Sequence, residues 1–394
     1  MRPVTARQTN CHVLIAILSF LVICSSQVAC AKDGSTPETL LLKDYRPRSI
    51  YKIPQTEVEK AKYPVIDMHA HVYAKTDEQI GGWVRLMDEV GIDKAIVMTG
   101  TTGREFDEIY AKYAMYPDRF EVWCGLDYTG YDKPGFGPSA VRELERCHKV
   151  GARGVGELGD KGKGLFYSKP TKAIGMHLDD PRMDQLLEKC AELQMPVNIH
   201  VADPYWMYEP MDAQNDGLMN AYKWRLDNKP DIVGHSGMLE ILEHGIKRHP
   251  KTTFIACHFA NCSHDLNRLG RLFDECPNLY ADISARYAET SAIPRFVARF
   301  YEKYQDRLVY GTDMRFGARM YRLTFRILES ADEHFYAWEQ FSYHWPLYGL
   351  ALNDQVLRKV YRENALKILR NQKFEATTSD SQRTDPPLKP ILLD

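Results

Sequence analysis

The sequence predicts an α/β protein with a (β/α)8 TIM-barrel fold, and two observations support this fold class. Eight short apolar, strand-like runs alternate with amphipathic helical patterns between residues 65 and 314, and such alternation builds a parallel sheet. No G-x-G-x-x-G turn follows the first run, and no P-loop motif occurs in the sequence. This disfavours the alternative, a doubly wound open sheet.

The expected strands are apolar runs that end at polar or turn-forming residues. We expect them at residues 65–71, 94–99, 120–126, 152–158, 196–202, 252–259, 279–284 and 307–313. Segment 180–194 illustrates the helices between them, because Met183, Leu186, Leu187 and Cys190 recur at i, i+3, i+4 and i+7. Eight such units in one domain of this length favour a barrel.

The composition of the chain excludes several classes of protein. Of its 394 residues, 44% are hydrophobic and 26% are charged, as is typical of a folded globular protein. Lysine plus arginine total 51 against 53 acidic residues, so the basic excess that would attract nucleic acid or an anionic membrane surface is missing. We therefore expect a small-molecule substrate and no nucleic-acid partner, and we leave open whether the chain forms a homodimer.

The first 31 residues predict a secretory signal peptide that is cut before Lys32. Arg2 and Arg7 make a basic start without acids, residues 13–24 form an apolar run, and Ala29-Cys30-Ala31 is an A-x-A cleavage site. That run would reach only ~18 Å as a helix, short of the ~30 Å core of a bilayer. An uncleaved anchor and stable membrane insertion are therefore disfavoured, and we expect an extracytoplasmic protein, periplasmic or secreted.

The mature chain divides by composition into a lead-in, a barrel and a tail. Residues 32–63 are a polar lead-in, residues 64–370 form the barrel, and the tail at 371–394 is expected to be disordered. Long insertions at 203–236 and 315–353 follow the fifth and eighth strands, on the face where barrel active sites lie. Both insertions are rich in aromatic residues. These residues could line a substrate pocket or form a small core within the insertions. For Trp206 we expect substrate binding.

Signal cleavage would leave six cysteines, at positions 124, 147, 190, 257, 262 and 276. Export would permit disulfides. Cys124 and Cys257, however, sit inside strand-like runs, where a buried thiol is the expected role. Cys30 is disfavoured as a lipid attachment site, because Gln27 stands where a lipoprotein signal needs an aliphatic residue.

The strongest chemical signal is the pair His69 and His71 in the first expected strand. Residues two apart on a strand project to the same side, so both imidazoles could bind one metal ion. Three more metal-competent groups end other strands: His200 the fifth, His258 the sixth and Asp313 the eighth. Because barrel active sites are assembled from the carboxyl ends of strands, this coincidence indicates a metal site.

In these motifs the chain resembles the amidohydrolase superfamily, specifically its amidohydrolase-2 branch, which includes aminocarboxymuconate semialdehyde decarboxylase and related metal-dependent enzymes. The resemblance covers roughly residues 64–370 and includes the closing helix with the motif at 363–369. It is specific for the fold and the metal site, but the branch contains both hydrolases and non-oxidative decarboxylases.

The resemblance implies that His69, His71, His200 and Asp313 bind one divalent metal, most often Zn²⁺ and sometimes Mn²⁺ in that branch. A second metal stays open. Asp313 would also take the proton from the attacking water, and His258 would hydrogen-bond the substrate or its developing oxyanion. Such a metal lowers the pKa of water toward ~7 and polarises a carbonyl group.

Several further residues are candidates with more than one reading. Glu157 ends the fourth strand, where binuclear relatives often carry a carboxylated lysine, and it could be a ligand, a substrate-binding acid or a salt-bridge partner of Lys161 or Lys163. Asp67 shares the side of His69 in a regular strand and could support a ligand by hydrogen bonding.

Arg286 and Arg315 could bind a substrate carboxylate, although surface arginines are the commoner case. Other histidines fall within or beside helices, and we expect them on the solvent side: His148, His244, His249 and His264. His177 and His235 fall in expected loops.

Three functions compete. The first is a secreted metal-dependent hydrolase that attacks an amide, ester or lactone carbonyl. The second is a metal-dependent decarboxylase of a small aromatic or unsaturated carboxylic acid, in which Asp313 would protonate carbon. The third, a non-catalytic binding barrel, is disfavoured because none of the expected metal-site positions is replaced. Export favours hydrolysis, because exported enzymes more often degrade scavenged compounds.

Overall fold

The computed structural model describes residues 36–169 and 171–370. The predicted signal peptide and the tail at 371–394 lie outside the described residues, so both remain predictions. The chain divides into two compact units at Asp44/Tyr45. The described part of the first unit contains a short 3-10 turn, η1 (Leu42–Asp44), and the second unit contains the fold described below.

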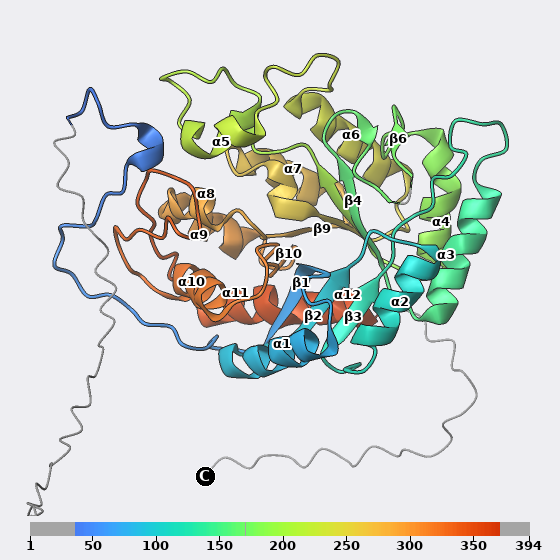
Figure 1. Cartoon of the computed structure of the whole chain (residues 1–394), viewed down its shortest axis with the longest axis horizontal. Helices are drawn as coiled ribbons and strands as arrows, with labels where there is room; N and C mark the ends of the chain where they lie inside the picture. The colour runs from blue at the N-terminus through green and yellow to red at the C-terminus, as the bar shows by residue number, and fades with distance from the viewer. Residues whose placement is uncertain (1–35, 170, 371–394) are drawn as a thin grey trace, which may run out of the picture. The chain divides into compact units, whose positions relative to one another are not determined.

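Within the described residues, the second unit is built around parallel strands (Figure 1). Eight of them form two sheets, in the orders β1-β2-β3 and β4-β7-β8-β9-β10. The strands are β1 (Val65–His71), β2 (Ile92–Met98), β3 (Phe120–Trp123), β4 (Val155–Asp160), β7 (Val197–Val201), β8 (Phe254–Ala256), β9 (Leu279–Asp282) and β10 (Leu308–Val309). A small antiparallel hairpin, β5 (Gly164–Leu165) with β6 (Ala173–Ile174), extends from the end of β4.

Backbone hydrogen bonds join the two sheets at both seams. Between β3 and β4, Cys124 N donates to Gly154 O at 3.0 Å, and Gly156 N donates to Cys124 O at 2.9 Å. Between β10 and β1, Met68 N donates to Tyr310 O at 2.9 Å. The eight parallel strands thereby follow one another around a ring, which confirms the predicted (β/α)8 TIM-barrel fold.

Helices surround the strands (Figure 1). They are α1 (Asp77–Val90), α2 (Gly103–Tyr113), α3 (Pro138–Val150), α4 (Asp184–Glu192), α5 (Leu218–Trp224), α6 (His235–Arg248), α7 (Leu266–Glu275), α8 (Tyr287–Ser291), α9 (Pro294–Lys303), α10 (Ala318–Glu329), α11 (Asp354–Arg358) and α12 (Asn364–Arg370). Single turns stand at η2 (Pro181–Met183), η3 (Tyr205–Met207) and η4 (Cys257–Asn261), and a π-helical segment, η5 (Lys359–Glu363), joins α11 to α12. No helix of the described residues is both long and apolar enough to cross a membrane.

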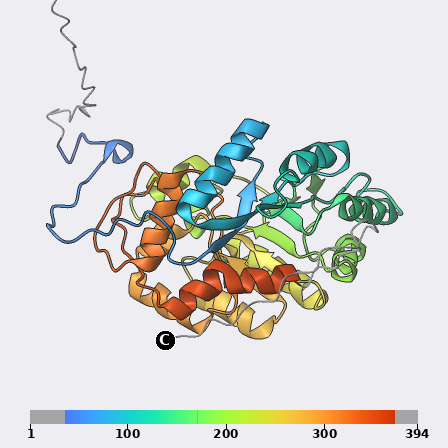
Figure 2. The ribbon, with the colours of Figure 1, turned by 90° about the horizontal axis from the view of Figure 1, so that it is seen from below.

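Two apolar layers hold the barrel together. The larger lies between the strands and the helices that surround them. The smaller fills the barrel, where Ile66 and Met68 of β1 pack with side chains of the other strands and with Ala365 and Ile368 of α12. The closing segment α11–α12, red in Figure 2, therefore plugs one end of the barrel and leaves the other for chemistry.

Several expected strands were too long at their carboxyl ends, and two of these, β8 and β10, lead into the segments that carry His258 and Asp313. β8 ends at Ala256 rather than residue 259, because His258, Phe259 and Ala260 adopt left-handed backbone angles with φ of 59°, 54° and 53°. β10 ends at Val309 rather than residue 313, and Asp313 is also left-handed, with φ of 49°. In both places the apolar sequence continues while the backbone leaves the strand.

The six cysteines of the described residues are buried and free. This agrees with the buried-thiol role expected for Cys124 and Cys257. In these residues, buried aliphatic and aromatic packing rather than cross-linking stabilises the barrel.

Candidate metal centre

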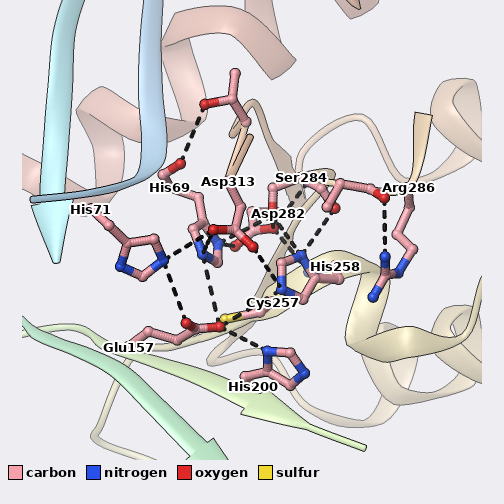
Figure 3. Close-up of polar contacts among 12 residues, drawn as sticks. His69, His71, Glu157, His200, Cys257, His258, Asp282, Ser284, Arg286 and Asp313 are labelled. Atoms are coloured by element: carbon pink, nitrogen blue, oxygen red, sulfur yellow. Dashed lines mark hydrogen bonds and ion pairs between the residues drawn. The ribbon is translucent and has the colours of Figure 1, made fainter. Parts of the chain in front are cut away.

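The structure brings the six strand-end candidates together around one space (Figure 3). His69 and His71 come from β1, Glu157 from β4 and His200 from β7, while His258 and Asp313 lie in the segments that follow β8 and β10. His71 Nε2 lies 3.1 Å from Asp313 Oδ1 and 3.5 Å from Glu157 Oε2. Glu157 Oε1 lies 2.8 Å from His200 Nδ1, so the two Glu157 oxygens face different imidazoles.

Each imidazole donates one N–H away from this space. His69 Nδ1 donates to Asp282 Oδ2 at 2.8 Å, and His71 Nδ1 donates to the Met98 carbonyl at 3.2 Å. His200 Nε2 donates to the Ala202 carbonyl at 2.9 Å, and His258 Nδ1 donates to the Ser284 carbonyl at 3.0 Å. In its neutral form each ring then presents a lone pair to the centre, as metal ligation requires.

The Nε2 atom of His69 is the clearest sign that a cation belongs here. The side chain is fully buried, and among the described residues Nε2 has no hydrogen-bond partner. The carboxylates of Glu157 and Asp313 face it at 3.8 and 3.7 Å. Overlapping groups of three side chains here offer ligand atoms within 4.8 Å of one another. Three or four nitrogens with two carboxylates suit a divalent ion such as Zn²⁺.

The carboxylates control the protonation of the site. Burial alone would lower the pKa of His69, but Asp282 and Asp313 outweigh it and raise the pKa to about 10. Burial would raise the pKa of Asp313, yet His69 and a hydrogen bond from His71 lower it to about 2. Burial lowers the pKa of His258. The field that draws a proton to His69 Nε2 also favours a metal cation there.

Sequence reasoning missed Asp282, which ends β9 beneath the centre. Its fully buried carboxylate accepts from His69 Nδ1 at 2.8 Å, from His258 N at 2.9 Å and from Ser284 N at 3.1 Å. It therefore fixes the position of two site histidines at once. A carboxylate near the end of a barrel strand was the available signal, because Asp282 lies close to the end of the expected strand 279–284.

Asp67 supports the proposed ligand His69 by hydrogen bonding, as predicted, but through the His69 backbone rather than its ring. The pairing of β1 with β2 shifts register between Asp67 and Ala70, so the regular alternation assumed for the strand fails. Asp67 instead accepts from Thr312 Oγ1 at 2.6 Å and from the backbone N of His69 at 3.1 Å. Burial raises the pKa of Asp67 to about 6.

A cleft of about 450 Å³ opens onto His200, His258 and Asp313. The two long insertions contribute to its walls, the first through Met207, Asn220 and Trp224 and the second through residues 340–343. We call this hollow the metal-facing cleft. The location agrees with the expectation that the insertions lie over the active-site face.

The lysine and the arginine that line the metal-facing cleft both have partners within the protein. Lys161 forms a salt bridge with Asp203 at 2.8 Å. The hypothesis that Glu157 is the salt-bridge partner of Lys161 is therefore wrong. The Nε and Nη2 atoms of Arg286 both donate to Asn261 Oδ1, at 3.1 and 2.7 Å, and Nη1 lies 3.6 Å from Glu289. Arg286 is buried, so the surface reading of this arginine is wrong.

Two predicted substrate-binding residues do not line the metal-facing cleft. Trp206 packs on Trp345 with ring centroids 5.9 Å apart and is not among the residues that line the metal-facing cleft. Arg315 is exposed and does not line the cleft either. Trp224, from the same insertion as Trp206, lines the metal-facing cleft instead. Sequence position alone could not separate these two tryptophans.

Three histidines were misplaced by the sequence analysis. His148 and His249 are buried rather than solvent-facing, because their helices and turns pack against neighbouring elements. His235 begins α6 rather than lying in a loop. Its Nε2 donates to the Asn261 carbonyl at 3.0 Å.

Comparisons with known proteins agree with the family suggested by the site. The family model described as amidohydrolase matches residues 61–370, while no curated protein matches. Similar solved structures include an uncharacterised TIM-barrel protein from Bordetella bronchiseptica, at 16% identity and TM-score 0.47, covering 78% of this chain and 99% of that one. Another is 4-oxalomesaconate hydratase from Rhodopseudomonas palustris, at 15% identity and TM-score 0.42, covering 78% and 96%.

A zinc-bound amidohydrolase from Burkholderia multivorans is similar at 11% identity and TM-score 0.45, covering 78% of this chain and 99% of its own. The family match extends over more than half of the present chain and includes every residue of the candidate metal centre. The chain therefore belongs to the amidohydrolase family, in its amidohydrolase-2 branch, and is a metal-dependent enzyme of that family.

Proposed function

We propose that the chain is a metal-dependent hydrolase that opens an amide, ester or lactone bond of a small molecule outside the cytoplasm. The observation that carries the proposal is His69 Nε2, a fully buried atom without a partner among the described residues, facing two carboxylates. The extracytoplasmic location rests on the sequence of residues 1–31.

His69, His71, His200 and Asp313 would hold the ion, and Glu157 would complete or extend the ligand set. We propose Zn²⁺ because imidazole and carboxylate donors suit it, with Mn²⁺ as the alternative. When bound, the ion would polarise a carbonyl group and acidify water. Glu157 faces His71 with one oxygen and His200 with the other, which also suits a second ion. Metal analysis of the purified chain, with anomalous peaks counted in a crystal, distinguishes one ion from two.

Asp313 is the proposed proton acceptor. Its carboxylate is 26% exposed, so it reaches the metal-facing cleft while Oδ2 remains 3.6 Å from His258 Nε2. Neutral His258 carries its N–H on Nδ1, so Nε2 can take a proton and then donate it to a leaving group or an oxyanion. The hydrogen bond that we expect His258 to donate to the substrate or its oxyanion therefore requires the protonated form of the ring.

The engaged cations of the cleft favour hydrolysis over decarboxylation. Lys161 is paired with Asp203, and Arg286 directs Nε and Nη2 to Asn261, so a decarboxylase would have to hold its substrate carboxylate through the metal without a free side-chain cation of this cleft. A neutral carbonyl compound needs no further cation there. Decarboxylation is the competing outcome of the assay below.

The test is a panel of aryl esters, lactones and hydroxybenzoate-type acids, followed by hydrolysis and by carbon dioxide release. Asp313→Asn should retain metal, because an amide oxygen still coordinates, but should lose ~10²-fold or more in rate. Asp306→Asn, at a carboxylate that is 67% exposed, is the matched control and should retain the full rate. Carbon dioxide release without hydrolysis, or full activity of Asp313→Asn, would overturn the proposal.

A further inference from the structure

A second hollow adjoins the metal centre on the side of β1, β2 and α2. Its volume is about 460 Å³, within the range of small-molecule sites. We call it the side cavity, and the residues that matter below are His71, Lys75, Thr99, Thr101, Lys112 and Lys169.

His71 separates this side cavity from the metal centre. Its ring lines the cavity while its Nε2 lies 3.1 Å from Asp313 Oδ1. The side chain is 29% exposed, and Met98, whose carbonyl holds the other ring nitrogen, lines the same cavity. His71 therefore belongs both to the metal centre and to the wall of the side cavity.

Thr101, in the wall of the side cavity, carries a buried polar group without a partner among the described residues. Thr101 is 1% exposed, and its hydroxyl finds no hydrogen-bond partner among the described residues. The neighbouring Thr99 hydroxyl is used, since it donates to the Trp123 carbonyl at 2.9 Å and accepts from Thr101 N at 3.1 Å. Buried hydroxyls are nearly always paired in proteins, so the Thr101 hydroxyl points to a polar ligand group.

The charge around the side cavity favours an anion. Three lysines and two glutamates line it, and one of these, Glu108, is engaged by Arg104 at 2.7 Å. Lys112 Nζ donates to the Lys75 carbonyl at 3.2 Å. The ammonium groups of Lys75 and Lys169 have no partner within residues 36–169 and 171–370, in contrast to the paired cations of the metal-facing cleft.

We propose that the side cavity is a second arm of the active site that binds a carboxylate carried by the substrate, at a distance from its scissile carbonyl. Lys75 and Lys169 supply the positive charge, and the Thr101 hydroxyl supplies a hydrogen bond. The assignment of the scissile carbonyl rests on the proposed function, whereas the carboxylate site rests on the side cavity itself.

The test is isothermal titration of the zinc-loaded mature protein with glutarate, and with glutaramide as its neutral counterpart. Glutarate should bind more tightly than glutaramide, and Lys75→Ala with Lys169→Ala should weaken glutarate at least tenfold, as expected for charged contacts. Thr101→Val should weaken it several-fold, while Thr101→Ser, which keeps the hydroxyl, should bind as the wild type does. Lys251→Ala, at an exposed lysine before β8, is the matched control.

Wild-type affinity of the double lysine variant would overturn the proposal, because glutarate would then be binding elsewhere, for example at the metal. Equal binding of glutarate and glutaramide would overturn it too. Tighter lysine-dependent binding of inorganic phosphate would replace carboxylate by phosphate as the ligand class. The titration needs no turnover, so lysine-dependent glutarate binding in a protein that hydrolyses nothing would refute the proposed function and leave this site standing.

Discussion

Replacing Asp282 by asparagine should weaken metal binding although Asp282 is not itself a proposed ligand. The Asp282 carboxylate accepts from His69 Nδ1 at 2.8 Å through Oδ2, and from His258 N at 2.9 Å through Oδ1. An asparagine amide has only one accepting atom, so one of these two donors would face an N–H₂ group. If that donor is His69 Nδ1, the ring rotates or moves its proton to Nε2, and the lone pair at the centre is lost.

The expected size of the effect follows from the kind of contact that is lost. Groups that orient a metal-bound histidine typically contribute 10- to 100-fold in metal affinity, which corresponds to about 1.4–2.8 kcal/mol. The metal-free fold should also lose about 1.5–3 kcal/mol, because a hydrogen bond to a buried charged group is lost. Thus Asp282→Asn should bind the ion more weakly and also unfold at lower denaturant concentration.

Competition with a chromophoric chelator measures the affinity, and urea unfolding of the metal-free protein measures the stability. Asp306→Asn, at an exposed carboxylate paired with Lys359, is the matched control and should change neither quantity. The reasoning is refuted if folded Asp282→Asn binds zinc with the wild-type dissociation constant.

Three further measurements concern a ligand, a buried histidine and the N-terminus. His69→Ala should lower metal affinity at least tenfold, and unchanged stoichiometry in the presence of a chelator would contradict the ligand assignment. His235 is buried, and burial lowers its pKa from the ordinary 6.5 to about 4. Between pH 6.5 and pH 4, His235 becomes protonated in the unfolded chain but stays neutral in the folded one. The free energy of unfolding should therefore fall by up to ~3 kcal/mol as the pH drops from 6.5 to 4. Urea titrations should show a smaller fall in His235→Gln. N-terminal sequencing from the native source should find Lys32 first, and an intact Met1 in a cytosolic fraction would reverse that prediction.

The residues that converge at the metal centre were accessible from the sequence because strand ends of a barrel meet at one face. His200, for example, could be placed by the apolar run before it, without knowledge of any long-range contact. Asp282 and the Lys161–Asp203 pair were not found, because their roles depend on which strand and which insertion lie next to them. The same limitation explains Trp206 and Trp224, which belong to one aromatic insertion and differ only in how it packs.

Local irregularities of the backbone also limited what could be predicted from the sequence. The register shift after Asp67 and the left-handed residues after Ala256 leave no trace in apolar periodicity. Because side-chain direction in a strand alternates with period two, one irregular residue reverses the predicted side of every residue on its far side. This is why the shared side of His69 and His71 was predicted, while the side to which Asp67 projects was not.

The left-handed turn at residues 258–261 has a consequence for laboratory evolution of this enzyme. Four successive residues without glycine hold φ between 53° and 59° there, a conformation that costs most L-residues roughly 1 kcal/mol each. Glycine adopts it freely but makes the turn more flexible. Selection for heat tolerance and selection for turnover should therefore diverge at Ala260. We expect glycine to be enriched under the first and alanine to be retained under the second, because this turn positions His258, which we propose acts on the substrate.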